Sequence, residues 1–129
     1  MAPPGPEPLK TGRLPTRLKV RAEFLRAAAR GRKAAVHGLV LQAFMREDTD
    51  PLRVGYTVTK KVGNAVVRNR TRRRLREAAR LLLAGQALPG VDLVLIGRDA
   101  TRGRPFGQLL DDLGRALGKA GVSLPDAPP

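Results

Sequence analysis

The sequence of 129 residues contains no cysteine, a single histidine, His37, and a single serine, Ser123. Without cysteine, the chain cannot form a disulfide framework, a zinc finger or a thiol nucleophile, and it suits a reducing compartment such as the cytoplasm. One histidine and no cysteine offer too few ligands for a transition-metal site. A lone serine near the C-terminus excludes a Ser–His–Asp triad.

Long apolar runs are also missing. No segment approaches the roughly 20 apolar residues of a membrane-spanning helix, and the N-terminus, MAPPGPEPLK, lacks the apolar stretch of a secretory signal. The phosphate-binding motif GxxxxGK[ST] is absent as well. These absences predict a soluble cytoplasmic protein without a P-loop. Only four aromatic residues are present, so the core must be mainly aliphatic: Phe24, Phe44, Tyr56 and Phe106.

Acidic residues are scarce beside basic ones. The chain has 25 lysines and arginines against 11 acids, a net charge of +14 and a pI near 11.7. Self-repulsion of this size opposes compaction unless a counter-charge is near, and nucleic acid is the usual one. The charge therefore predicts a nucleic-acid partner, with a membrane surface as the competing polyanion.

Composition shifts and hydrophobic periodicity predict one domain with two tails. Residues 1–16 are rich in Pro and Gly, which predicts a disordered tail. The folded domain is predicted over residues 17–118, and a flexible tail over residues 119–129. Apolar spacing predicts helices over 17–30, 64–84 and 106–118, and strands over 32–46 (split at Gly38), 52–60 and 91–97.

The predicted order is α-β-β-β-α-β-α, an α+β fold with one central sheet and helices packed on it. The loop 47–51 is short, so we expect the strands on either side of it to be antiparallel. The acids of this loop predict a solvated turn rather than a catalytic site. Asp111 and Asp112 are expected to be a solubilising pair on the polar side of the last helix. Residues 98–105 predict a basic loop.

The most informative segment runs from Tyr56 to Arg80, YTVTKKVGNAVVRNRTRRRLREAAR, and contains nine basic residues and one acid. Gly63 and Asn64 predict a turn followed by a helix N-cap. At helical spacing, an aliphatic stripe including Leu75 opposes a cationic face including Arg72 and Arg73. Ordinary solvated helix faces mix acids and bases. This face instead predicts phosphate binding, since arginine pairs bidentately with phosphate oxygens.

The segment KKVGNAVVRNRTRRRLRE, residues 60–77, resembles the signature of the bacterial ribonuclease P protein component. The resemblance extends over roughly residues 13–118, with matching positions at Arg17, Phe24 and Gly31 upstream. It implies the α-β-β-β-α-β-α fold with a left-handed βαβ crossover. It also implies a role as the RNA-binding subunit of an endoribonuclease that removes the 5′ leader from precursor tRNA.

In that family the RNA subunit holds the active site and most of the Mg²⁺ ions. The resemblance thus implies two partners, the ribonuclease P RNA and precursor tRNA, no membrane, and a monomeric protein in a 1:1 complex with the RNA. It implies a leader cleft between the first helix and the sheet, at Phe24, His37 and Gln42. It implies an RNA-contacting set that comprises Lys60, Lys61, Asn64, Arg68, Asn69, Arg70, Arg72, Arg73 and Arg76.

Three positions depart from the family pattern. Ala28 and Gln42 stand where cleft aromatics are common, and Arg74 stands where an apolar residue is usual. Two other classes of function remain open on the sequence: a structural RNA-binding protein, such as a ribosomal protein, and a self-contained nuclease. The nuclease has the weaker basis, because the basic segment lacks acids to hold a catalytic metal.

Overall fold

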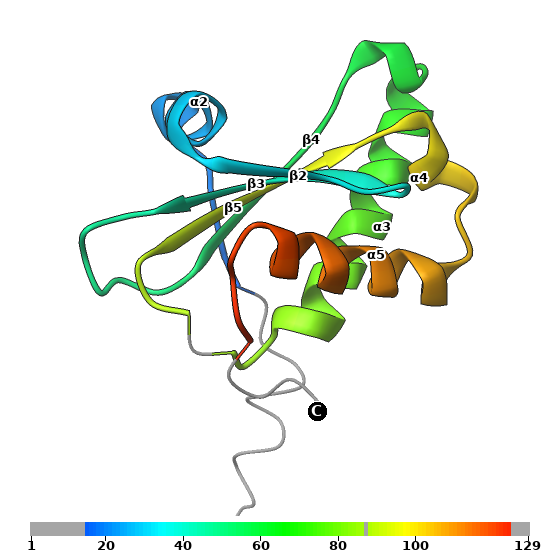
Figure 1. Cartoon of the computed structure of the whole chain (residues 1–129). Coiled ribbons are helices and arrows are strands. Elements are labelled where there is room, and N and C mark those ends of the chain that lie inside the picture. The colour runs from blue at the N-terminus through cyan, green and yellow to red at the C-terminus, as the bar shows by residue number, and fades with distance from the viewer. Residues whose placement is uncertain (1–14, 87, 125–129) are drawn as a thin grey trace, which may run out of the picture.

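The computed structural model describes residues 15–86 and 88–124. Its strands are β1 (Thr16–Arg17), β2 (Arg32–Ala35), β3 (Leu39–Met45), β4 (Arg53–Val58) and β5 (Val91–Gly97). Its helices are α2 (Arg21–Arg30), a 3₁₀ turn η1 (Lys60–Val62), α3 (Ala65–Leu83), α4 (Asp99–Gly103) and α5 (Phe106–Lys119). The sheet is the middle layer, with α2 on one face and α3 and α5 on the other (Figure 1).

The strand order across the sheet is β1-β4-β5-β3-β2. β4 and β5 are parallel neighbours joined through α3, which makes the predicted βαβ unit; its left-handed sense stays a prediction. The predicted α+β class and the order of the main elements are confirmed, including the division of the 32–46 segment at Gly38 into β2 and β3. The strands on either side of the 47–51 loop run antiparallel, as expected, but they are not neighbours, because β5 lies between β3 and β4 and pairs with both.

Two cores hold these layers together. The larger lies between the sheet and the α3–α5 layer and is built from aliphatic side chains such as Leu41, Leu75, Leu93 and Leu113. The smaller lies under α2 and contains Leu18, Ala27 and Val94, with aromatic and aliphatic side chains packed around them. The alternate apolar side chains of β4 point into the larger core, where Val54 is fully buried. The sheet is thus doubly covered only where α2 lies across it.

The first helix begins later than predicted, at Arg21 rather than residue 17. Arg17 pairs with Val54 in a parallel ladder, and the Leu18 N–H donates to the Val54 carbonyl at 3.0 Å. The pairing with β4 and the burial of Leu18 outweigh the local helical periodicity, which contains no information about β4. Leu25 of this helix is 54% exposed, so the helical periodicity does not place it in the core.

The C-terminal region also differs from the prediction. The expected basic loop 98–105 contains the short helix α4. Asp112, predicted to be solvated, is fully buried and accepts a 2.8 Å hydrogen bond from Arg104. Ala120 and Val122, assigned to the flexible tail, are buried in the larger core. Residues 1–14 and 125–129 of the predicted tails lie outside the described residues.

Candidate nucleic-acid interface

The cationic helix α3 starts from a well-defined turn. The Asn64 side chain accepts a 3.0 Å hydrogen bond from the backbone N–H of Val67, which confirms the predicted N-cap. Gly63 lies so close to Val67 that a Cβ atom there would come within 2.8 Å of Val67 Cγ1. The turn η1 precedes it, so Lys60 and Lys61 lie beside the helix N-terminus. The positive end of the helix dipole therefore adds to the two lysine charges.

We call the nine predicted RNA-contacting residues on η1 and α3 the arginine face. Part of it is held by local contacts: Arg68 Nε donates to the Gly63 carbonyl at 3.2 Å, and Arg72 Nη1 donates to Asn69 Oδ1 at 2.6 Å. Arg76 lies near Tyr56 on the neighbouring strand; burial raises the pKa of Tyr56 to about 12, although the Arg76 charge acts in the opposite direction.

Four cations of the arginine face have no partner among the residues that the structure describes. Lys60, Lys61, Arg70 and Arg73 make no hydrogen bond or ion pair with any residue that the structure describes. The acid of this helix, Glu77, instead pairs with Arg80, whose guanidinium lowers the pKa of the Glu77 carboxyl. The face thus combines oriented side chains with uncompensated charge.

Arg74 has a different role from the arginines around it. Its Nη1 donates to the carbonyls of Thr101 and Arg102, both at 2.7 Å, and its Nη2 donates to the carbonyl of Arg104. These carbonyls belong to the end of α4 and the residues after it, so Arg74 fastens α4 to α3. The position where the family usually has an apolar residue is therefore occupied by a structural cation.

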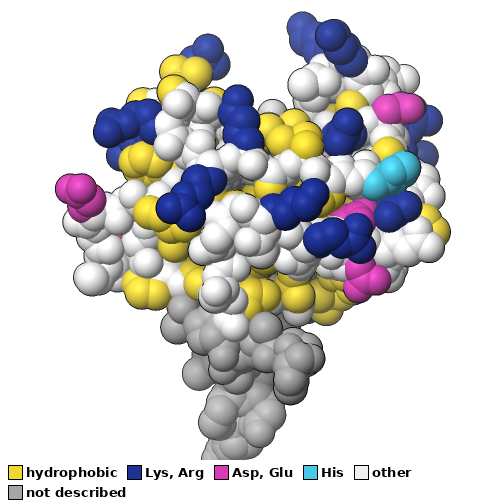
Figure 2. Space-filling model, viewed as in Figure 1, with side chains coloured by type: hydrophobic (Ala, Val, Ile, Leu, Met, Phe, Trp, Pro, Cys, Tyr) yellow, Lys and Arg dark blue, Asp and Glu magenta, His cyan; other side chains and the backbone are white. Residues whose placement is uncertain are grey.

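Phe24 projects from α2 against the open side of the sheet. Gly55 makes this possible, because a Cβ atom there would lie 2.5 Å from the Phe24 ring. Gln42 pairs with Val94, and Val94 with Gly55, so Gln42 belongs to the row of strand residues whose Gly55 lies under the Phe24 ring. Beyond this row α2 leaves the sheet open. The surface is hollowed there between α2 and η1, with basic side chains on both sides and apolar ones at the bottom (Figure 2).

His37 is not in that row. It is exposed and lies in the turn between β2 and β3. The residues near Phe24 lie toward the other end of these two strands. Two side chains at the start of α4 hold this turn in place. Arg98 Nη1 donates to the Val36 carbonyl at 2.7 Å, and the Thr101 hydroxyl donates to the Gly38 carbonyl. The predicted cleft residues therefore divide into a central pair, Phe24 and Gln42, and a peripheral His37.

Phe44, which faces the same side of the sheet as Gln42, was not among the predicted cleft residues. The Arg26 guanidinium lies 4.5 Å from the centre of its ring. Phe44 also packs against the smaller core under α2. Its position two residues after Gln42 on a strand was the available signal, because alternate strand residues share a face.

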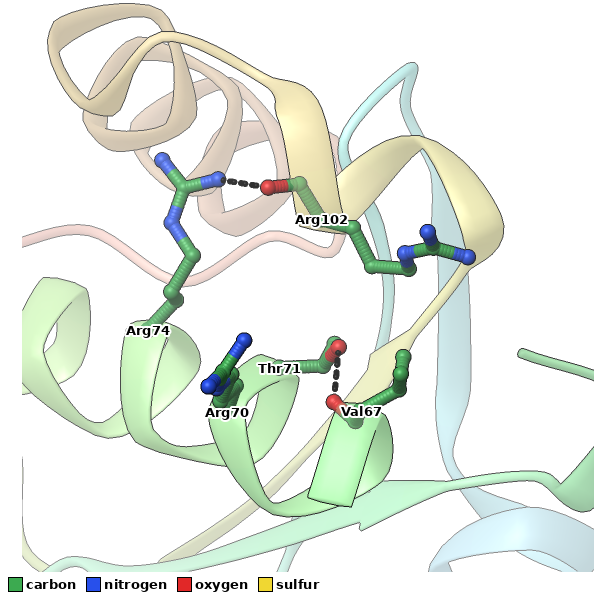
Figure 3. Close-up of a pocket in the computed structure, with 5 residues that line it drawn as sticks. All are labelled: Val67, Arg70, Thr71, Arg74 and Arg102. Atoms are coloured by element: carbon green, nitrogen blue, oxygen red, sulfur yellow. Dashed lines mark hydrogen bonds between the residues drawn. The ribbon is translucent and has the colours of Figure 1, made fainter. Parts of the chain in front are cut away.

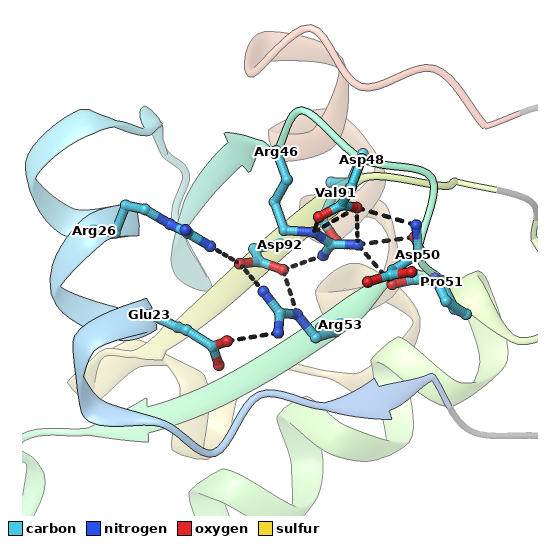
Figure 4. Close-up of polar contacts among 9 residues, drawn as sticks. All are labelled: Glu23, Arg26, Arg46, Asp48, Asp50, Pro51, Arg53, Val91 and Asp92. Carbon is cyan, nitrogen blue, oxygen red and sulfur yellow. Dashed lines mark hydrogen bonds and ion pairs between the residues drawn. The ribbon is translucent and has the colours of Figure 1, made fainter.

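A second overlooked residue is Asp92, an acid in the apolar strand β5. It is fully buried and accepts hydrogen bonds from Arg26 at 3.1 Å, from Arg53 at 2.8 and 2.9 Å, and from Arg46 (Figure 4). Burial alone would raise the pKa of Asp92, but hydrogen bonds from Arg53 and Arg46 outweigh it and leave the pKa below its ordinary value. Glu23 of α2 joins through Arg53 at 2.6 Å.

This cluster fixes α2 to the sheet. Arg26 and Glu23 belong to α2, whereas Arg53 and Asp92 belong to β4 and β5. The helix that carries Phe24 is therefore attached through ion pairs as well as apolar packing. A single acid within an otherwise apolar strand was the sequence signal, because a buried carboxylate requires charged partners.

The described residues contain no group of three His, Asp or Glu side chains that could hold a metal ion. Nor is any helix among them both long and apolar enough to cross a membrane. Several acids are instead engaged by arginines, as for Asp92 and Asp112.

Residues 14–121 match the family model described as Ribonuclease P. The chain belongs to the ribonuclease P protein family. Relatives named "Ribonuclease P protein component" include that of Gluconacetobacter diazotrophicus, 69% identical over 106 residues, which cover 82% of this chain and 91% of the relative. That of Paramagnetospirillum magneticum is 54% identical, over 82% of this chain and 83% of the relative.

Solved ribonuclease P proteins have the same fold. The protein from Staphylococcus aureus superposes with a TM-score of 0.69 at 27% identity, covering 88% of this chain and 94% of that one. The protein from Thermotoga maritima gives a TM-score of 0.65 at 25% identity, covering 77% and 92%. The family assigned from residues 60–77 is thus confirmed by sequence and by fold.

Proposed function

We propose that this chain is the RNA-binding protein subunit of ribonuclease P. It assists the catalytic RNA in the endonucleolytic removal of the 5′ leader from precursor tRNA. Membership of the family supports this proposal, and so does the arginine face. The observation that carries it is that Lys60, Lys61, Arg70 and Arg73 point uncompensated charge outward from a rigid turn and helix.

The arginine face binds the RNA subunit. Guanidinium groups bind phosphate oxygens in a bidentate manner and stay charged at any working pH. The N-terminus of α3 between Lys60, Lys61 and the capping Asn64 provides a further phosphate seat. Phosphate neutralisation releases counterions, so the affinity falls steeply as salt rises.

The groove that binds the single-stranded leader is the hollow on the open face of the sheet between α2 and η1 (Figure 2). Its floor is apolar near Phe24, and Gln42 lies in the same row with its side chain almost covered, 8% exposed. Phe44 is stacked under Arg26 and so presents less ring surface than an unpaired aromatic residue. Leader binding at this groove therefore depends on shape and backbone contacts together with Phe24. His37 lies outside this groove, in the exposed turn between β2 and β3.

The protein contributes binding and position, whereas the RNA subunit contains the catalytic centre and holds most of the Mg²⁺ ions. The engagement of Asp92, Asp112 and Glu77 by arginines supports this division, because these carboxylates already have cationic partners. The protein acts as a monomer in a 1:1 complex with the RNA, in the cytoplasm.

The test is a cleavage assay with the cognate RNA subunit and precursor tRNA at low Mg²⁺ and moderate salt. We expect the protein to stimulate release of the 5′ leader over the RNA alone. No stimulation would refute the proposed function. Cleavage by the protein in the absence of the RNA subunit would support a self-contained nuclease instead.

A further inference from the structure

A small pocket lies between the N-terminal half of α3 and the short helix α4. It is lined by Val67, Arg70, Thr71, Arg74 and Arg102 and has a volume of about 190 Å³. Val67 and Thr71 come from α3, Arg74 stands at one side and Arg102 at the other (Figure 3). Pockets for drug-sized ligands usually occupy about 300–1,000 Å³, so this one suits a single small ring system.

Two of the three guanidinium groups around the pocket are held in place. Arg74 donates to carbonyls of Thr101 and Arg102 at 2.7 Å. Arg102 donates to the Val62 carbonyl and to Asp99, both at 3.2 Å. These contacts fix planar cations on opposite sides of the pocket without a ligand. Arg70, by contrast, has no hydrogen-bond or ion-pair partner among the described residues and stays available to an anion.

The wall between these cations is mostly hydrocarbon. Val67 is half-buried, and Thr71 is almost fully buried with its hydroxyl already donating to the Val67 carbonyl at 2.8 Å. A phosphate alone would gain nothing from such a wall. An unpaired base, however, is a planar ring that packs on apolar side chains and stacks on guanidinium planes, while its phosphate seeks a cation.

We propose that this pocket takes one unpaired nucleotide of the RNA subunit. The base lies against Val67 between the guanidinium groups of Arg74 and Arg102, and its phosphate pairs with Arg70. The proposal rests on the proposed function, since it assigns a nucleotide-sized subsite within the arginine face. It adds α4 to an interface otherwise formed by η1 and α3.

The test combines chemical probing of the RNA subunit, base by base, with binding measured across a salt series. The variants Val67→Phe, which fills the pocket, and Val67→Ala, which removes its apolar wall, are compared with Arg73→Ala, an exposed arginine of α3 outside the pocket. We expect the unmodified protein to protect one unpaired base that both Val67 variants leave reactive. Loss of one stacked base should weaken binding roughly tenfold.

The salt series separates stacking from charge. Both Val67 variants should keep the slope of log K against log salt, whereas Arg73→Ala should lower its magnitude by about one and keep the base protected. The proposal is overturned if no base responds to Val67→Ala, or if Arg73→Ala exposes the same base. If Val67→Phe unfolds, Val67→Ala decides alone. Failure of the unmodified protein to bind the RNA subunit would refute the proposed function itself, which is a separate outcome.

Discussion

Asp92 joins α2 to the sheet through its ion pair with Arg26. Its carboxylate is fully buried among Arg26, Arg46 and Arg53, and the Arg46 side chain is only 4% exposed. Removal of one member of a buried ion pair is costly because the partner charge stays in the interior. The cluster therefore links stability to the placement of Phe24.

The variant Asp92→Asn should lower the free energy of unfolding by about 3 kcal/mol, since it leaves Arg46 without its buried counter-charge. Urea denaturation measures the change. The matched control is Asp99→Asn, in which the lost ion pair joins an 84% exposed carboxylate to Arg102 and should change the stability by less than about 0.5 kcal/mol. Equal effects of the two variants would contradict the assigned role of Asp92.

Acid should destabilise the protein by protonating its buried aspartates. Arginine contacts hold the pKa of Asp92 and of Asp112 below the ordinary value, so the unfolded chain binds protons that the folded chain does not. This stabilisation is complete above the unfolded pKa of about 4 and is lost as the pH falls through the lower folded values. The urea concentration at the unfolding midpoint, measured from pH 7 to pH 3, should decrease once the pH is below about 4. The decrease should be smaller for Asp112→Asn. A midpoint independent of pH would contradict this.

At the scale of elements, η1 and the first turn of α3 serve folding and binding at once. Asn64 caps the helix through Val67, while Lys60 and Lys61 lie next to the same N–H groups. A substitution there can separate the two tasks, because capping needs an acceptor oxygen whereas phosphate binding needs the absence of negative charge.

The variants Asn64→Ala and Asn64→Asp should therefore behave in opposite ways. Asn64→Ala removes the cap and should cost about 1 kcal/mol of stability. Asn64→Asp keeps an acceptor for Val67 and should leave the stability nearly unchanged, but its carboxylate should weaken RNA binding more than Asn64→Ala does. Thermal melts and a binding titration give both readouts. Tighter RNA binding by Asn64→Asp would contradict the assignment of this turn as a phosphate seat.

Helices and strands with clear periodicity could be predicted from the sequence, and those that depend on distant partners could not. The cap at Asn64 and the apolar stripe around Leu75 are local patterns, and both are confirmed. β1 pairs with the edge of β4, and the carbonyls at the end of α4 accept hydrogen bonds from Arg74. Neither interaction leaves a mark in the neighbouring sequence.

The same limit applies to the candidate interface. Helical spacing predicts the outward cationic side of α3, including Arg72 and Arg73, whereas the full nine-residue set rests on the resemblance to the family. The roles of Arg74 and Asp92 could not be predicted. In the sequence, Arg74 looks like another cation of the basic helix, and Asp92 looks like an interruption of an apolar strand. Their partners lie 27 and 39 or more residues away along the chain, at Thr101 and Arg53 respectively.

At the scale of the whole molecule, a net charge of +14 and an uncompensated arginine face predict binding dominated by counterion release. The double variant Arg72→Ala with Arg73→Ala should reduce the slope of log K against log salt by about two while the melting temperature stays close to the original. Both side chains lie on the outer side of α3, so the core is untouched. If the melting temperature fell together with the affinity, the two residues would be part of the fold rather than of the interface.

The position of β5 has a consequence for the synthesis of the chain. β5 is the last strand in sequence, yet it lies between β3 and β4 and pairs with both. A nascent chain that ends before residue 91 thus lacks the strand that joins its two halves, and the non-local pairings can form only afterwards. Until then the cationic helix is present without a finished domain. Ribosome-arrested chains should accordingly resist proteolysis only once Gly97 has left the exit tunnel.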